Sequence, residues 1–173
     1  MELENIKNIK AHEYLEFRRK INGTDNEKFR GNLKENYSLL EKYCKDEIGK
    51  KATVLLLSEK HNLLQNDEIV NAVKSIIELD YIKSNNFDFK VNPDIKNATD
   101  FLRHILLGVE IESNFAHNGS KAILYLLQQI RDNITHNGKF ELDDEQFERN
   151  YQFVKAGSEI SDKIIEMLTS SSC

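Results

Sequence analysis

The sequence predicts an all-α protein, and three observations support that prediction. The chain of 173 residues has only seven Gly and one Pro, so few residues interrupt helices. Charged residues make up 31% of the chain and hydrophobic residues 39%, with many Lys, Glu, Leu and Ile. Apolar residues also recur at spacings of three and four, the period of one helix face. A chain of this length can bury one core, so we expect one domain, or one domain with an extra arm.

Residues 1–60 are expected to form an N-terminal helical extension or arm. A weakly amphipathic helix is predicted over 4–21, and a second helix over 27–48. The apolar face of the second helix consists of Phe29, Leu33, Tyr37, Leu40, Cys44 and Ile48. Residues 52–64 could continue as helix or form a short buried segment, because periodicity does not distinguish the two. The whole region could pack on the rest of the chain as a layer or serve as an oligomer arm.

Residues 61–168 are expected to fold as an antiparallel four-helix bundle with mostly short connections. Asp67 is predicted to cap the first helix, which extends to about residue 83. A polar connection then ends at Pro93, the only proline, and the second helix is predicted over 97–114.

The third and fourth helices of the bundle follow a tight turn at residues 117–119. Ser120 is predicted to begin the third helix, and the pair Asn137-Gly138 to end it. Its apolar stripe is Ile123, Leu126, Leu127, Ile130 and Ile134. Asp143 is predicted to begin the last helix, which continues to about 168 with Gln146 in the capping-box position. Residues 169–173 are expected to be a flexible tail.

Composition narrows the class of function. The net charge of −5 argues against nonspecific coating of nucleic acid, although a local basic groove remains compatible with it. Cys44 and Cys173 lack the spacing of metal ligands, so neither a metal nor a cofactor is expected. The N-terminus lacks the apolar core of a signal peptide, and no apolar run is long enough to span a bilayer. We therefore expect a cytoplasmic protein without a membrane partner.

The strongest functional pattern is Arg-Asp-Asn-Ile-Thr-His at residues 131–136. Asp132 and His136 are separated by four residues, so on a helix the carboxylate can orient the imidazole. Arg131 can stabilise phosphate charge through several N–H donors, and the imidazole can exchange protons near neutral pH. RNA supplies its own nucleophile, the 2′-hydroxyl. The pattern therefore predicts cleavage of RNA, with Arg131, His136 and Asp132 as catalytic residues.

Helical geometry places Arg131 and His136 on opposite flanks of the apolar stripe, roughly 140° apart. One straight helix therefore presents them poorly to a single small ligand. If two chains meet near a two-fold axis, Arg131 of one copy could act beside His136 of the other. The sequence thus predicts a homodimer with a composite site.

The stretch IRDNITHNGKF resembles the signature of the HEPN superfamily, which is Arg, a polar residue, three to five further residues and His. The resemblance is specific over 120–140 and extends more broadly over 66–168. It implies an all-α bundle that dimerises and a metal-independent endoribonuclease that leaves 2′,3′-cyclic phosphate ends. Arg131 would match the family arginine, Asp132 its polar partner and His136 its histidine.

The family also suggests roles and partners. Its members act in toxin–antitoxin, anti-phage and RNA-processing systems, so an antitoxin or defence partner protein is expected. One branch carries a tyrosine two residues after the histidine, which a partner enzyme modifies, and this chain has Gly138 there. Some members are noncatalytic, so a module that binds RNA or a protein is the alternative function.

Three further residues are candidates for contacts with RNA. Lys139 follows the motif directly, and Asn133 lies within it. An antiparallel hairpin that turns near residues 117–118 would bring Arg103 alongside the motif as well. The simpler interpretation of all three is solvated or packed polar side chains, and that of Arg131 and His136 is a solvated helix end.

Overall fold

The computed structural model describes residues 25–48, 53–78, 93–110, 118–135 and 144–170. Every regular element within these ranges is helical, which confirms the all-α prediction. The elements are α3 (Asp25–Tyr43), the π-helical turn η1 (Cys44–Ile48), the 3₁₀ helices η2 (Val54–Glu59) and η3 (Leu63–Gln65), α4 (Asp67–Ile77), α6 (Pro93–Leu107), α7 (Gly119–Thr135) and α8 (Asp144–Ser170). The helix expected over 4–21 lies outside the described residues.

The segment that follows α3 settles one open alternative. The helix predicted over 27–48 is present as α3 and η1, whose wider turn begins at the buried Cys44. Residues 54–65 form two short 3₁₀ helices rather than a continuation of helix. Thr53 and Asn62 cap them, each with a side chain that accepts a hydrogen bond from a backbone N–H two residues later.

The cap predicted for α4 is wrong by one residue. Asn66 has an extended backbone, and its side chain accepts a hydrogen bond of 3.0 Å from the backbone N–H of Ile69. Asp67 is instead the first helical residue, where its charge suits the helix dipole. Because Asn and Asp cap helices equally well, backbone geometry rather than residue type decides between them. The helix ends at Ile77 with Glu78 as its C-cap, short of the predicted residue 83.

The bounds of α6 also differ from the prediction of 97–114. The helix begins at Pro93, because proline fits the first helical position, where no N–H is needed. It ends at Leu107, because Gly108 has a φ of 74° and turns the backbone out of the helix. Apolar Val109 continues the helical spacing beyond that end, which explains why periodicity overextended the helix.

The start of α7 was predicted one residue late. Asn118 caps the helix, since its side chain accepts a hydrogen bond of 2.9 Å from the backbone N–H of Lys121. Ser120, the predicted start, is buried, and its hydroxyl accepts a 2.8 Å hydrogen bond from the backbone N–H of Leu63. The stop predicted at 137–138 and the cap predicted at Asp143 lie outside the described residues, and α8 covers most of the predicted last helix.

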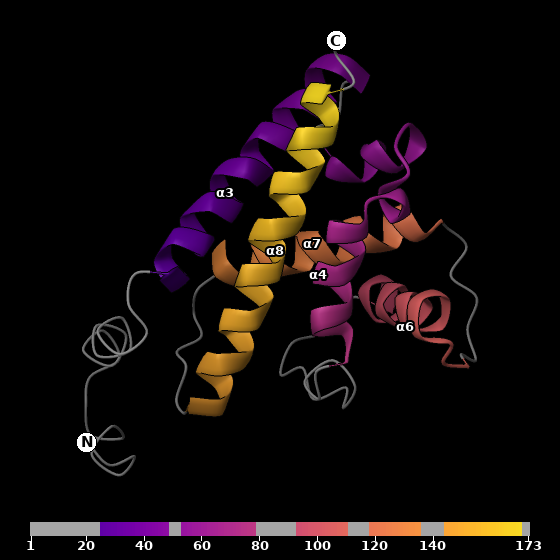
Figure 1. Cartoon of the computed structure of the whole chain (residues 1–173). Coiled ribbons are helices and arrows are strands. Elements are labelled where there is room, and N and C mark those ends of the chain that lie inside the picture. The colour runs from indigo at the N-terminus through magenta and orange to yellow at the C-terminus, as the bar shows by residue number, and fades with distance from the viewer. Residues whose placement is uncertain (1–24, 49–52, 79–92, 111–117, 136–143, 171–173) are drawn as a thin grey trace.

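The helices α3 and α8 lie side by side and run in the same direction (Figure 1). Side-chain amides of α3 donate to α8, at 2.7 Å from Asn32 to Ser158 and at 3.0 Å from Asn36 to Ser161. The helix α4 lies on another side of α8 and runs opposite to it, with an ion pair of 2.6 Å between Glu68 and Lys163. Residues 25–48 therefore pack on the other helices of the same chain.

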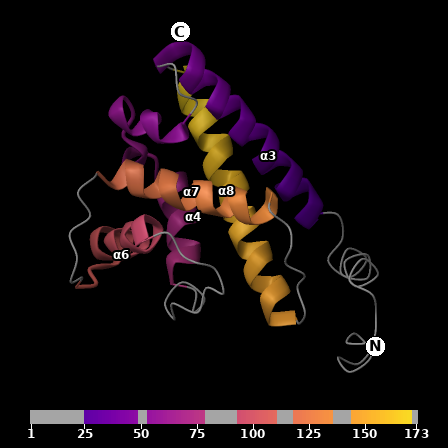
Figure 2. The same cartoon turned by 180° about the vertical axis from the view of Figure 1, so that it is seen from behind.

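Seen from behind, α7 crosses the α3–α8 pair steeply (Figure 2). The helix α6 packs on α7, yet Figure 1 shows α6 nearly along its axis and α7 lengthwise. These consecutive helices thus cross rather than form a closely aligned hairpin. The C-terminal end of α7 contacts α3.

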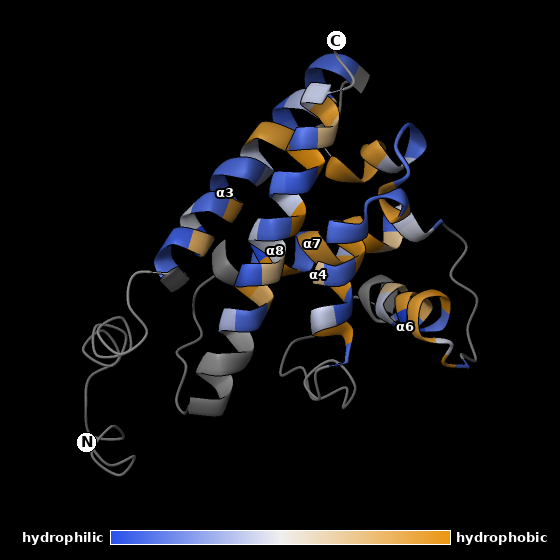
Figure 3. Ribbon diagram, in the orientation of Figure 1, coloured by the Kyte–Doolittle hydropathy of each residue, from blue (hydrophilic) through white to orange (hydrophobic). Residues whose placement is uncertain are grey.

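The core lies where α3, α4, α7 and α8 meet, and their inward faces are apolar (Figure 3). Gly157 of α8 lies where this helix faces both α3 and α7. A Cβ atom there would lie 2.9 Å from Cδ2 of Leu33 on α3 and 3.2 Å from Cγ2 of Ile130 on α7. The absence of a side chain therefore lets α8 approach both helices closely.

Within the described ranges, none of the helices combines the length and apolar character needed to cross a bilayer.

Candidate functional site

The helix α7 positions the first part of the motif. Its buried face contains Ile123, Leu127 and Ile130, which anchor the helix in the core. Arg131 and Asp132 follow in the last turn and are half-buried. The helix ends at Thr135, immediately before the position of His136.

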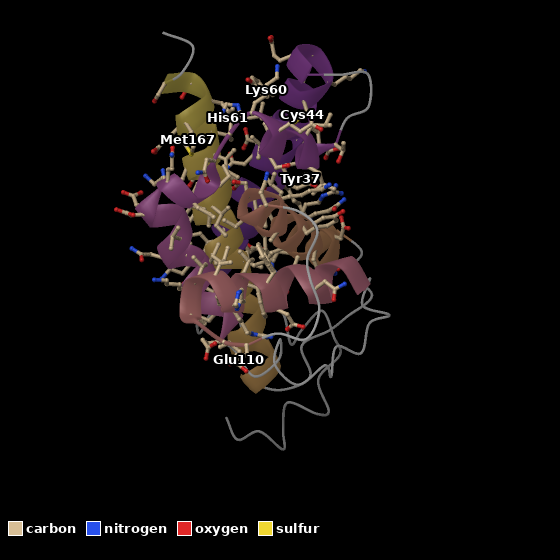
Figure 4. The ribbon with its side chains drawn as sticks, turned by 90° about the vertical axis from the view of Figure 1, so that its right-hand side faces the viewer. Tyr37, Cys44, Lys60, His61, Glu110 and Met167 are labelled. Carbon is tan, nitrogen blue, oxygen red and sulfur yellow. The ribbon has the colours of Figure 1, made fainter. Side chains whose placement is uncertain are left out.

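Arg131 is held by residues from two helices. Its guanidinium carbon lies 4.2 Å from the centroid of the Tyr37 ring, a stacked cation–π arrangement. Its Nη2 atom is 3.5 Å from a Glu41 carboxylate oxygen, and its Nη1 atom is 3.3 Å from an Asp132 oxygen. Figure 4 shows Tyr37 where α3 passes α7. The Arg131 side chain thus contacts residues of its own helix and of α3.

The contacts of Arg131 differ in how deeply they are buried. Tyr37 is only 3% exposed, whereas the side chains of Glu41 and Asp132 are 36% and 39% exposed. Both ion pairs are longer than the 2.7–2.9 Å that is typical of strong charge-assisted hydrogen bonds. The ring is therefore the fixed support of the guanidinium, and the carboxylates are solvated neighbours.

Burial also sets the ionisation of this cluster. Burial raises the pKa of Tyr37 to about 12, while the nearby Arg131 guanidinium acts in the opposite direction. Burial acts to lower the pKa of Arg131, but Tyr37, Asp132 and Glu41 together raise it above its usual value. At neutral pH the site therefore contains a phenol and a permanent cation.

Asp132 was expected to orient His136, and among the described residues its carboxylate lies beside Arg131. The two residues are adjacent in the sequence, and the long Arg131 side chain brings its Nη1 atom to 3.3 Å from Oδ1 of Asp132. His136 lies outside the described residues, as do Lys139 and the side chain of Asn133. The contact between Asp132 and His136 and the two RNA contacts therefore stay predictions.

The structure does not bring Arg103 to Arg131 in any contact of the described residues. Arg103 is 9% exposed and lies where α6 meets the end of α4. Its Nε donates a 2.9 Å hydrogen bond to the carbonyl of Ile77, and its Nη1 pairs with Asp100 at 2.7 Å. The expected hairpin would have placed it beside the motif, but α6 crosses α7 instead. Arg103 thereby satisfies a carbonyl at the C-terminal end of α4.

Tyr37 and Glu41 are the site residues that the sequence did not identify. The sequence predicts Tyr37 only as part of an apolar helix face, and its ring is indeed buried. Glu41 follows four residues later on the same face of α3, a spacing that brings both side chains to one partner. That spacing is the only signal in the sequence, and it does not name the partner.

No group of three or more His, Cys, Asp or Glu side chains in the described parts of the chain is arranged to hold a metal ion. The residues described around Arg131 offer one cation, one phenol and two carboxylates. This arrangement suits recognition of an anion that can compete with the carboxylates for the guanidinium.

No family model, curated protein or solved structure matches this chain.

Proposed function

We propose that this protein is a metal-independent endoribonuclease of HEPN type, with a composite site built by two copies. The observation that carries the proposal is the placement of Arg131. Its guanidinium is held on the Tyr37 ring in the last turn of α7, is 24% exposed, and precedes His136 by five positions. A phosphodiester needs such a cation at the attacked phosphorus.

In the proposed reaction, His136 takes the proton of the RNA 2′-hydroxyl, and the 2′ oxygen attacks the adjacent phosphorus. The bond from phosphorus to the 5′ oxygen breaks, and that oxygen takes a proton from water. Arg131 stabilises the charge that develops on the phosphoryl oxygens, and Asp132 orients the imidazole. Lys139 and Asn133 remain proposed RNA contacts, whereas the buried Arg103, bonded to Ile77 and Asp100, is not among them.

The proposal includes an antiparallel four-helix core of HEPN type with additional N-terminal helices. The antiparallel pair α4 and α8, joined by the Glu68–Lys163 ion pair, supports it. The helix α3 runs parallel to α8 and contributes to the same core, so in this proposal it is the N-terminal helix that joins the bundle. A toxin or anti-phage role, with an antitoxin or defence partner protein, and a cytoplasmic location belong to the same proposal.

RNA end chemistry tests the proposed function. We expect wild-type protein in EDTA to leave 2′,3′-cyclic phosphate ends, and Arg131→Ala and His136→Ala to leave none. His104→Ala is the matched control, because His104 is an exposed histidine of α6 whose Nδ1 contacts the Val109 carbonyl. Undiminished cleavage by both folded variants would exclude this site. RNA binding without any product would favour the alternative, a noncatalytic module.

Complementation tests whether the site is shared between copies. If Arg131 and His136 act from different chains, an equal mixture of the two inactive variants regains about a quarter of wild-type activity, since half of the dimers are mixed and each mixed dimer holds one of two intact sites. A mixture that stays inactive although the chains exchange would place both groups in one chain.

A further inference from the structure

We propose that α3 is part of the anion-binding site: Tyr37 positions Arg131, and Glu41 occupies the guanidinium until an RNA phosphate displaces it. This inference rests on the proposed role of Arg131. It adds Tyr37 and Glu41 to the site, and it makes phosphate binding depend on displacement of the Glu41 carboxylate. The sequence motif contains neither residue, because α3 comes to the site only through the fold.

Tyr37 has the properties of a positioning residue. Its ring is almost wholly buried and covers one face of the Arg131 guanidinium, with 4.2 Å between ring centroid and guanidinium carbon. Stacking directs the N–H groups at the edge of the guanidinium plane toward oxygen acceptors, which here include the carboxylates of Glu41 and Asp132. The ring can therefore hold the cation in place while its acceptors exchange.

Glu41 has the properties of a competitor rather than of a permanent partner. Its carboxylate is 3.5 Å from Nη2, a weak ion-pair distance, and the side chain is partly solvated. A phosphate oxygen at a normal charge-assisted distance would interact more strongly with the same nitrogen. Since Glu41 and Asp132 both flank Arg131, the free site is also repulsive to weakly bound anions. Glu41 thus selects for a ligand with enough negative charge to replace it.

A pair of matched variants separates this local competition from a change in net charge. Glu41→Gln removes the carboxylate next to Arg131, and Glu35→Gln removes one from an exposed position of the same helix. Inorganic phosphate is the probe, and NMR signals of the Arg131 side chain report its dissociation constant. We expect two- to fivefold tighter binding for Glu41→Gln and no change for Glu35→Gln. Equal effects of the two variants, or none for Glu41→Gln, would overturn the role of Glu41.

The role of Tyr37 is tested on the same scale. Tyr37→Phe keeps the aromatic face and should bind phosphate as the wild type does, whereas Tyr37→Leu should bind about fivefold more weakly. Equal affinity of the two folded variants would overturn the positioning role. If Tyr37→Leu does not fold, Tyr37→His is measured in its place, because its ring can also stack on the guanidinium. A loss of phosphate binding in folded Tyr37→Phe would overturn the positioning role as well.

RNA cleavage by the same variants separates the two proposals. Glu41→Gln should lower KM for RNA about as much as it lowers the phosphate dissociation constant, with kcat nearly unchanged. If no variant cleaves RNA but the phosphate pattern holds, the proposed nuclease fails and the anion site stands. If cleavage depends on Arg131 and His136 but Glu41→Gln binds phosphate and RNA as the wild type does, the nuclease stands and the competition fails.

Discussion

Arg103 and Arg131 show how differently one fold can use the same side chain. Arg103 is almost wholly buried, with short hydrogen bonds to a backbone carbonyl and to Asp100. Arg131 is more exposed, rests on an aromatic ring and has long ion pairs to two partly solvated carboxylates. Short hydrogen bonds to fixed acceptors suit Arg103 to a structural role. A fixed aromatic support with acceptors that can exchange suits Arg131 to binding a ligand.

The largest effect should come from Arg131→Ala. We expect RNA cleavage to fall about 10²–10³-fold, as for other removed donors to transition-state charge, while the free energy of unfolding changes by about 1 kcal/mol. Single-turnover cleavage and urea unfolding measure the two quantities. A loss of several kcal/mol with unchanged cleavage per folded molecule would reverse the comparison with Arg103.

The converse is expected for Arg103→Ala. Removing the guanidinium leaves Asp100 and the Ile77 carbonyl without their partner, so unfolding should become easier by about 3 kcal/mol. Arg103→Lys should recover part of this loss, because an ammonium can satisfy one acceptor but lacks the planar fork. Urea unfolding measures both variants. A fully stable Arg103→Ala protein with weakened RNA affinity would instead assign Arg103 to the RNA interface.

Alkaline pH should lower the free energy of unfolding through two buried groups, Tyr37 and Cys44. Burial raises the pKa of Tyr37 from 10.0 to about 12 and that of Cys44 from 9.0 to about 11, so the folded protein holds both protons more tightly than the unfolded chain. The contribution of Tyr37 to the free energy of unfolding is complete below pH 10 and is lost as pH rises through about 12, at about 3 kcal/mol. The contribution of Cys44 is complete below pH 9, is lost as pH rises through about 11, and is the smaller of the two.

Tyr37→Phe measures the tyrosine part of this loss. Its free energy of unfolding should fall less steeply than that of the wild type between pH 10 and 12, and Cys44→Ala should flatten the range from pH 9 to 11. Identical pH profiles for wild type and Tyr37→Phe would show that the phenol titrates normally.

The smallest effect concerns the other end of α4, the helix whose last carbonyls Arg103 satisfies. Asn66→Ala should cost about 1 kcal/mol because it removes the N-cap acceptor for the Ile69 N–H. Asp67→Ala, the control, should cost less, since Asp67 contributes only through the helix dipole. Thermal unfolding of both variants checks the order, and a greater loss for Asp67→Ala would restore Asp67 as the cap.

Local sequence rules predicted the helices and misplaced their ends for physical reasons. The apolar stripe of α7 is strong enough to identify the helix, but Asn118 and Ser120 are both good caps, and a tertiary hydrogen bond to Leu63 uses the serine. Similarly, α6 ends at the positive φ of Gly108, and the spacing of apolar residues contains no information about that backbone angle.

Only the part of the site that lies within one sequence motif was predictable. Arg131 and Asp132 stand out because they belong to one motif, whereas Tyr37 and Glu41 reach them through the crossing of α3 and α7. A helix face in the sequence does not reveal which helix will cover it. The same limit explains Arg103, whose expected place beside the motif assumed an aligned hairpin of α6 and α7.

The parallel pairing of α3 and α8 has a consequence for the order of folding. Asn32 and Ser158, which bond across this pair, are 126 residues apart, so the contact forms only after a very long loop closes. Such contacts form slowly, and we expect α3 to dock after the helices that follow it have assembled. Pulsed hydrogen exchange during refolding should then protect the amides of α7 before those of α3. A growing chain would therefore carry an unsupported Arg131 until its last helix has been synthesised.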